Sequence, residues 1–280
     1  MNYRNILVYL DESPSSRVRL NFALELAADH GAHLCGFLMS YVPSNFLKIF
    51  DNKSPISKQE FGHGLSRRQQ AAREDFENSA RALGVSASWA MAAHSQQREA
   101  IFYGCVFDLV IIGQLHSAEE RPNFGDNFLD NLLLDVGRPV LITPKGKEIV
   151  NANFRNIAIA WDGSREAARA VADAMPLLKK AQLVTILTVL PAPARNEHEK
   201  VTPPDLAELL RRHDVVAEHI TNPCAANAAN WIMTRSEVLS TKADLLVAGA
   251  YGHSPLGEKL LGGVTRSLLQ EMQIPILMSH

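Results

Sequence analysis

The chain has 280 residues, of which 46% are hydrophobic and 21% charged, and its formal net charge is −2. This length is comfortable for two domains of ordinary size, and the composition is that of a globular protein. Because no run of Lys or Arg is long enough to follow a phosphate backbone, nucleic acid is excluded as the main partner.

Short sequence patterns further restrict the class of protein, through its expected location, its cysteines and its histidines. The N-terminus lacks the parts of a signal peptide and no eighteen apolar residues follow one another, so we expect a cytoplasmic protein with no membrane partner. The three cysteines, Cys35, Cys105 and Cys224, are far apart and lack CxxC spacing, which indicates free thiols. The histidines show no HExxH pattern and no pair four apart on a helix, so no metal site is predicted.

The chain contains an internal repeat. Three pairs of segments match: YRNILVYLDES from Tyr3 and FRNIAIAWDGS from Phe154, DLVIIG from Asp108 and DLLVAG from Asp244, and RPVLITP from Arg138 and IPILMSH from Ile274. The last two pairs are both separated by 136 positions, so the stretch between them aligns without gaps. We predict a tandem duplication, with domains at 1–148 and 149–280 and a boundary near the polar segment KGKEIVNAN.

Each half alternates β-branched runs with helix-like segments, which is the pattern of an α/β domain with a parallel sheet. In the second half we predict strands at about 155–161, 182–190, 214–220, 244–249 and 274–279. After the first strand, Ser164 stands where a helix N-cap would, and Glu166 lies near the first turn. The helical face of this segment consists of Ala167, Val171, Ala174 and Leu178.

A glycine-rich stretch, GAYGHSPLGEKLLGGVT, occupies residues 249–265 after the fourth of these strands. In open parallel sheets, ligands bind beyond the carboxyl ends of the strands, where the strand order reverses. If the first and fourth strands are neighbours, Asp162 faces Gly249 and Gly252. The carboxylate can accept from a ribose hydroxyl or an exocyclic amine, and the glycines let a ribose or phosphate approach the backbone.

The end of the stretch suits an anion. Gly262 and Gly263 precede a predicted helix, whose N-terminal amides favour negative charge, and Thr265 adds a hydroxyl donor. His253 directly follows a glycine and is in reach of a phosphate. Tyr251 either stacks near a ribose or packs at the strand end.

Plainer interpretations stay open for the same residues. Glycines after a strand often form only a tight turn, and Asp162 before Gly163 also suits a turn and helix cap. The segment GHSPLGEK is not a Walker A loop, because Glu258 stands where that motif requires lysine.

The order G-x-x-G, nine residues, then glycine and small or hydroxyl residues resembles the ATP-binding signature of the universal stress protein (UspA) family. The matching residues are Gly249, Gly252, Gly262, Val264 and Thr265. The segments VYLDES, IAWDGS, DLLVAGAYGHS and PILMSH also resemble that family, so the resemblance covers both halves. It implies two tandem Rossmann-like α/β domains, each with a doubly wound, five-stranded parallel sheet, packed through their last strands about a pseudo-twofold axis.

The resemblance also implies an adenine nucleotide as ligand. Asp162 would meet the adenosine moiety, a residue near Val189 would line the adenine pocket, and the glycines would hold the ribose and phosphates of ATP, with or without Mg²⁺. One departure is Gly263, which stands where the family usually has Ser or Thr and so removes a hydroxyl from the phosphate site.

The first half lacks the signature. In the gap-free alignment, the equivalents of Gly249, Gly252, Gly262, Gly263 and Thr265 are Gly113, His116, Asp126, Asn127 and Leu129. A carboxylate would repel phosphates, and the side chains would obstruct a close approach to the backbone. We therefore expect a degenerate first domain that binds no nucleotide.

Two functions remain. The first is a stress-response regulatory protein that binds ATP in its second domain, with at most slow hydrolysis. The second is a stress-response interaction protein whose site is vestigial or holds another small ligand. No GxSxG elbow occurs and no carboxylate or glutamine is evidently placed to orient water, so no catalytic residue is predicted. Homodimer formation and the identity of any protein partner stay open.

Overall fold

The computed structural model describes residues 2–11, 13–39, 58–91, 97–114, 127–146, 152–189, 205–222, 228–238, 243–252 and 263–280. Within these stretches, the side chains of 58–66 and 235–238 are not described. Six residues singled out by the sequence lie outside them: His116, Asp126, Cys224, His253, Glu258 and Gly262.

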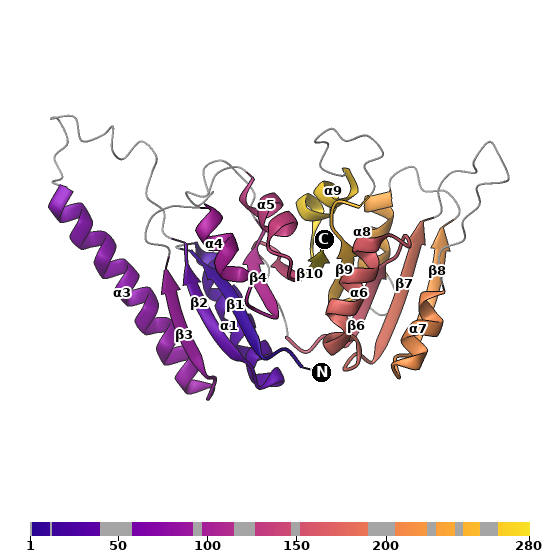
Figure 1. The fold of residues 1–280 in the computed structure, drawn as a ribbon, viewed down its shortest axis with the longest axis horizontal. Helices are drawn as coiled ribbons and strands as arrows, with labels where there is room; N and C mark the ends of the chain where they lie inside the picture. Colours follow the sequence, from indigo (N-terminus) through magenta and orange to yellow (C-terminus); the bar gives the residue numbers. More distant parts are fainter. Residues whose placement is uncertain are drawn as a thin grey trace.

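The two halves share one order of elements (Figure 1). The first half contains β1 (Asn5–Leu10), α1 (Pro14–His30), β2 (His33–Leu38), α3 (Lys58–Ala82), β3 (Ala87–Met91), α4 (Gln97–Gly104), β4 (Leu109–Gly113), α5 (Phe128–Asp135) and β5 (Val140–Thr143). The second half contains β6 (Asn156–Ala160), α6 (Arg165–Leu178), β7 (Leu183–Val189), α7 (Leu206–Arg212), β8 (Ala217–Asn222), α8 (Ala228–Val238), β9 (Leu245–Gly249), α9 (Gly263–Glu271) and β10 (Ile276–Ser279).

The described strands form one continuous sheet in the order β3-β2-β1-β4-β5-β10-β9-β6-β7-β8. Every neighbouring pair is parallel except β5 and β10, which are antiparallel and place Leu141 opposite Leu277. The last strands of the halves therefore join at the centre of the molecule, as Figure 1 shows. The predicted α/β class, the doubly wound order and the pseudo-twofold packing are confirmed.

Local sequence explains the best-defined helix. The Ser164 hydroxyl caps α6 by accepting a hydrogen bond from the amide of Ala167 at 3.1 Å, and the four predicted face residues are all buried. The strand predicted from 214 begins only at Ala217. Asp214 has a φ of 63°, in the left-handed region, and its amide closes the turn after α7, so the chain is not yet extended there.

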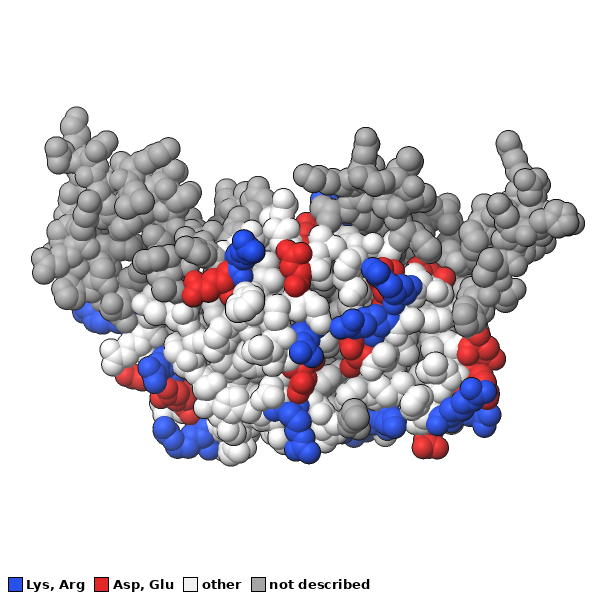
Figure 2. All heavy atoms as spheres, viewed as in Figure 1, with Lys and Arg blue, Asp and Glu red and all other residues white. Residues whose placement is uncertain are grey.

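Helices cover both faces of the sheet. One apolar cluster packs α1, α3, α6 and α7 against one face, and the other packs α4, α5, α8 and α9 against the opposite face. Each cluster includes side chains from both halves, so the two halves share their core. No helix in the described stretches is both long and apolar enough to cross a membrane. On the face in Figure 2, basic and acidic side chains are interspersed.

The amino ends of the first strands also join the halves. Phe22 of α1 lies against Phe154, with ring centroids 5.9 Å apart. In the pseudo-symmetric position, the hydroxyl of Tyr3 donates to the backbone carbonyl of Asp173 at 2.7 Å. An aromatic contact on one side therefore corresponds to a hydrogen bond on the other.

His30, at the end of α1, is buried in this junction. Its ring lies 5.1 Å from that of Tyr3, and neither ring nitrogen has a hydrogen-bond partner in the described part of the chain. Asp29 beside it binds Lys180 of the second half at 2.7 Å. Burial lowers the pKa of His30 to about 4; the Lys180 charge acts in the same direction and Asp29 opposes it.

This burial predicts acid sensitivity. Between the ordinary pKa of 6.5 and the folded value of about 4, the unfolded chain binds a proton that the folded chain excludes. His30 therefore adds a loss of stability as the pH falls from about 6.5 towards 4, and none above that window. Urea unfolding at pH 7 and pH 4.5 should show a larger loss in the wild type than in His30→Phe. An equal loss in both proteins would contradict a neutral, buried His30.

Candidate functional site

The carboxyl edge of the second half brings the predicted residues together. Strand β6 lies between β7 and β9, so the strand order reverses there, and Ala160 pairs with Ala248. Asp162 follows β6, and the glycine stretch begins at the end of β9. The neighbouring strands that the ligand interpretation required are therefore present, at the place where open α/β sheets bind ligands.

Asp162 is exposed and makes one local contact. Its Oδ1 accepts a hydrogen bond from the amide of Ser164 at 2.9 Å, and Gly163 between them has a φ of 75°. The carboxylate thus does shape the turn before α6, as the plainer interpretation held. Its Oδ2 makes no hydrogen bond to the described residues, so one oxygen is available to a ligand.

Gly249 and Gly252 both have a packing reason to be glycine. A Cβ on Gly249 would lie 2.6 Å from the backbone nitrogen of Ala167, inside α6. A Cβ on Gly252 would lie 2.9 Å from Oε2 of Glu166 and 3.4 Å from the Ser164 hydroxyl. Both glycines therefore let the β9 end approach the N-terminus of α6; their contact with a ligand stays a prediction.

Tyr251 and Thr265 hold the stretch in place. Tyr251 has a φ of 57°, and its amide donates to the buried Thr265 hydroxyl of α9 at 3.1 Å. Its own hydroxyl donates to the carboxylate of Asp130, in α5 of the first half. Burial, followed by this hydrogen bond, raises the pKa of Tyr251 well above its ordinary range. Tyr251 thus links the stretch to the first half through a contact that no pattern in the sequence predicts.

The N-terminus of α9 has space beside it among the described residues. The helix begins at Gly263, and a Cβ added there would meet no described atom within 4 Å. Val264 is 45% exposed. His253 and Gly262 lie outside the described residues, so their predicted contacts with phosphate stay predictions.

Partly buried apolar residues at the ends of β6 and β7 pack on one face of the sheet at this edge. Val189 ends β7, is partly buried, and faces the same side of the sheet as Ala160, Trp231 and Tyr251. Trp231 of α8 was missed by the sequence reading, although an aromatic residue among Ala, Ile and Met on a short helix is a usable signal. A flat ring beyond β7 would find apolar surface here.

Glu166 is the second residue that sequence reasoning missed, because it was assigned only to the first turn of a helix. Its side chain is 11% exposed and pairs with the exposed Arg165 at 2.9 Å through Oε1. Its other oxygen is the atom nearest to an added Cβ at Gly252. The Glu166 carboxylate therefore lies beside Gly252, as the amide of Ala167 in α6 lies beside Gly249.

At the carboxyl edge of the first half, the side chain of Arg19 occupies the equivalent position. Arg19 of α1, with a side chain only 3% exposed, binds Asp11 at 2.5 Å and donates to the carbonyl of Tyr9 at 2.7 Å. A Cβ on Gly113 would collide with this guanidinium. Since Asp11 and Gly113 are the equivalents of Asp162 and Gly249, the arginine occupies the space between the two positions. The second half has Ala170 at the position of Arg19.

Comparisons with known proteins identify the fold. Residues 153–280 match the model of the universal stress protein family. The structure is similar to a universal stress protein from Archaeoglobus fulgidus, with a TM-score of 0.71 and 16% identity over 98% of this chain and 95% of that one. It is also similar to a functionally unknown protein from Pseudomonas aeruginosa, with a TM-score of 0.62 and 16% identity over 99% and 92% of the two chains.

No curated protein gives a significant match to the sequence. The resemblance noted in the sequence is nevertheless confirmed by the family match and by the similarity in fold over nearly the whole chain. Residues 153–280 are thus similar in sequence to universal stress protein domains, and the chain as a whole has the fold of two such domains in tandem.

Proposed function

We propose that the protein is a regulatory protein that binds one adenine nucleotide, ATP, at the carboxyl edge of β6 and β9. The observation that carries the proposal is that Asp162, with one uncommitted carboxylate oxygen, lies at the strand-order reversal beside the glycine stretch. Asp162 would accept from the ribose or the adenine amine, and Val189 would lie against the base. Binding, with at most slow hydrolysis, is the proposed activity.

Phosphates would be held by the N-termini of α6 and α9. The amides of a first helical turn have no partners within the helix and carry partial positive charge. No described atom lies within 4 Å of a Cβ added at Gly263, at the start of α9, and the Thr265 hydroxyl accepts a hydrogen bond from the amide of Tyr251, which keeps that residue close to the helix. Both features support an anion at this position.

Glu166 would be unfavourable beside a bare polyphosphate. Arg165 balances its charge, and a carboxylate at this position suits Mg²⁺, which is usually held by one or two carboxylates together with substrate phosphates. Glu166 is therefore the residue that would bind Mg²⁺ accompanying ATP. The same carboxylate favours the second candidate function, in which the site holds a small ligand without a polyphosphate.

Mass spectrometry of small molecules released on denaturing the purified protein tests the proposal. An adenine nucleotide near one equivalent per chain supports it, and so does its uptake by protein that was purified empty. A different compound that ATP cannot displace would support the second candidate.

Gly263→Ser should strengthen ATP binding. The space around Gly263 accommodates a side chain, and the added hydroxyl would lie at the N-terminus of α9, where it can donate to a phosphate. A single charge-assisted hydrogen bond of at least ~1.5 kcal/mol corresponds to roughly tenfold tighter binding in titration calorimetry. Gln270→Ser, an exposed position at the other end of α9, serves as the matched control and should change the affinity little. Equal effects of the two changes would refute the phosphate position.

A further inference from the structure

A cavity lies between the two halves, at the amino edge of the sheet. It has a volume of about 760 Å³ and is bounded by residues before β1, β4 and β5 on one side and by α6 on the other. Cavities of this size accommodate small organic molecules. Because Asp162 and the glycine stretch follow strand ends, this cavity and the candidate nucleotide site lie at opposite edges of the sheet.

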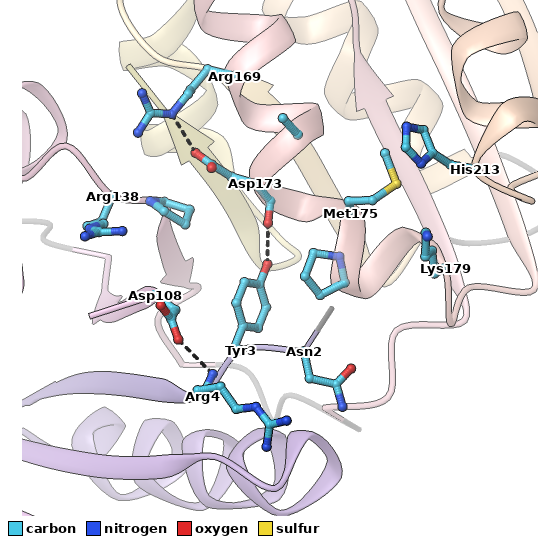
Figure 3. A pocket seen from close by; sticks show the side chains of 13 residues that line it. Asn2, Tyr3, Arg4, Asp108, Arg138, Arg169, Asp173, Met175, Lys179 and His213 are labelled. Carbon is cyan, nitrogen blue, oxygen red and sulfur yellow. Dashed lines mark hydrogen bonds and ion pairs between the residues drawn. The ribbon is translucent and has the colours of Figure 1, made fainter. Parts of the chain in front are cut away.

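Positive charge dominates the cavity. Four cationic side chains line it, Arg4, Arg138, Arg169 and Lys179, against two carboxylates (Figure 3). Arg169 pairs with Asp173 at 3.1 Å. Within the described part of the chain, the other three cations have no carboxylate partner.

The second carboxylate, that of Asp108, accepts hydrogen bonds from backbone amides. Asp108 accepts from the amides of Arg4 and Asn5 at 2.8 and 3.0 Å, which fixes the start of β1 beside β4. In the other half, Asp244 accepts from the amides of Arg155 and Asn156 in the same way. The structural framework of the cavity wall is therefore present twice in the molecule.

Three of the four cations are present only once, since Arg4 alone has a charged equivalent, Arg155. The pseudo-symmetric positions carry uncharged residues: Ile274 for Arg138, Val18 for Arg169 and Ala28 for Lys179. There, Phe22 packs on Phe154 where the cavity side has Asp173 and Tyr3. Arg138 and Arg169 have a structural part to play, because they donate to the carbonyls of Cys105 at 2.8 Å and Gly137 at 3.0 Å. The same framework nevertheless forms in the other half without them, and no side-chain hydrogen bond to a described residue accounts for Lys179.

We propose that this cavity binds a small organic anion with at least two negative charges, such as a tricarboxylate or a phosphate monoester. Arg138 comes from the first half and Lys179 from the second, at opposite sides of the cavity in Figure 3, so a ligand that spans the cavity would contact both. Pro139, Met175 and Pro176 supply an apolar wall for its carbon skeleton. Since an anion there contacts both halves, its binding also stabilises their junction.

Citrate and glucose 6-phosphate are suitable probes, with glucose as the uncharged control. Titration calorimetry should detect binding of one charged probe per chain, weakened by added salt, and none of glucose. A preference for citrate identifies the carboxylate class, and a preference for glucose 6-phosphate the phosphate class. If neither binds at millimolar concentration, the proposal is wrong.

Variants at the cavity and away from it test where the anion binds. Arg138→Ile with Lys179→Ala copies the pseudo-symmetric residues and should weaken binding at least about tenfold, while the melting temperature of the free protein reports separately on the loss of the Arg138–Cys105 hydrogen bond. Arg155→Ala, at the exposed equivalent of Arg4, should leave binding unchanged. Gly252→His with Gly262→Asp, at the opposite edge, should also leave it unchanged. Loss of binding in this last variant, or full affinity in the first, would overturn the proposal.

Discussion

ATP binding is expected to be lost when Gly252→His and Gly262→Asp are introduced together, while the fold is retained. The pair copies His116 and Asp126 of the first half into the second. An added Cβ at Gly252 already lies 2.9 Å from the Glu166 carboxylate, so an imidazole must displace that side chain or occupy the ligand space. The new aspartate adds negative charge just before α9. Two lost phosphate contacts of at least ~1.5 kcal/mol each predict a loss of at least about a hundredfold.

The matched control makes the reverse change in the first half. His116→Gly with Asp126→Gly should leave the ATP affinity of the chain unchanged and create no second site, because Arg19 still occupies the space between Asp11 and Gly113. Titration calorimetry compares both variants with the wild type. Undiminished affinity in the second-half variant would mean that the glycine stretch is not the phosphate cradle.

Leu141→Ala is expected to destabilise both halves at once. Leu141 and Leu277 are fully buried, face each other across the antiparallel β5–β10 pair, and belong to the core cluster that both halves share. Removing a buried leucine side chain costs about 2–5 kcal/mol. Because no boundary divides the core, urea unfolding should remain a single transition at a lower midpoint.

Two comparisons sharpen this expectation. Leu277→Ala, across the pseudo-twofold axis, should cost a similar amount, and Leu209→Ala on α7, where the side chain is 46% exposed, should cost less than about 0.5 kcal/mol. Fluorescence and circular dichroism should give coincident unfolding curves. Two separate transitions in the wild type would show that the halves fold independently.

The repeat made most of the fold predictable. A strand pattern that occurs twice, with the same spacing at its end, predicts two equivalent sheets, and the Ser164 cap with its apolar face predicts α6. These features depend on residues close together in the chain. The late start of β8 was not predicted, because the left-handed turn at Asp214 is taken by a residue type that also occurs in extended chain.

The site was only partly predictable, because its remaining contacts join residues far apart in the sequence. Glu166 reaches Gly252, and Tyr251 reaches Asp130 in the other half; neither contact leaves a pattern in the sequence. Arg19, in contrast, does leave a pattern in the sequence. It is a charged residue at a helix position flanked by buried Ser16 and Leu20, where the other half has alanine, and such a position requires an internal partner for the charge.

The number of ATP molecules bound per chain tests the central claim most directly. Titration calorimetry of the wild-type protein, with its concentration of intact chains determined independently, should give one ATP per chain, because Arg19 occupies the space between Asp11 and Gly113 in the first half. Two equivalent sites would contradict the role assigned to Arg19 in the first half, and no binding at millimolar ATP would contradict the proposed function itself.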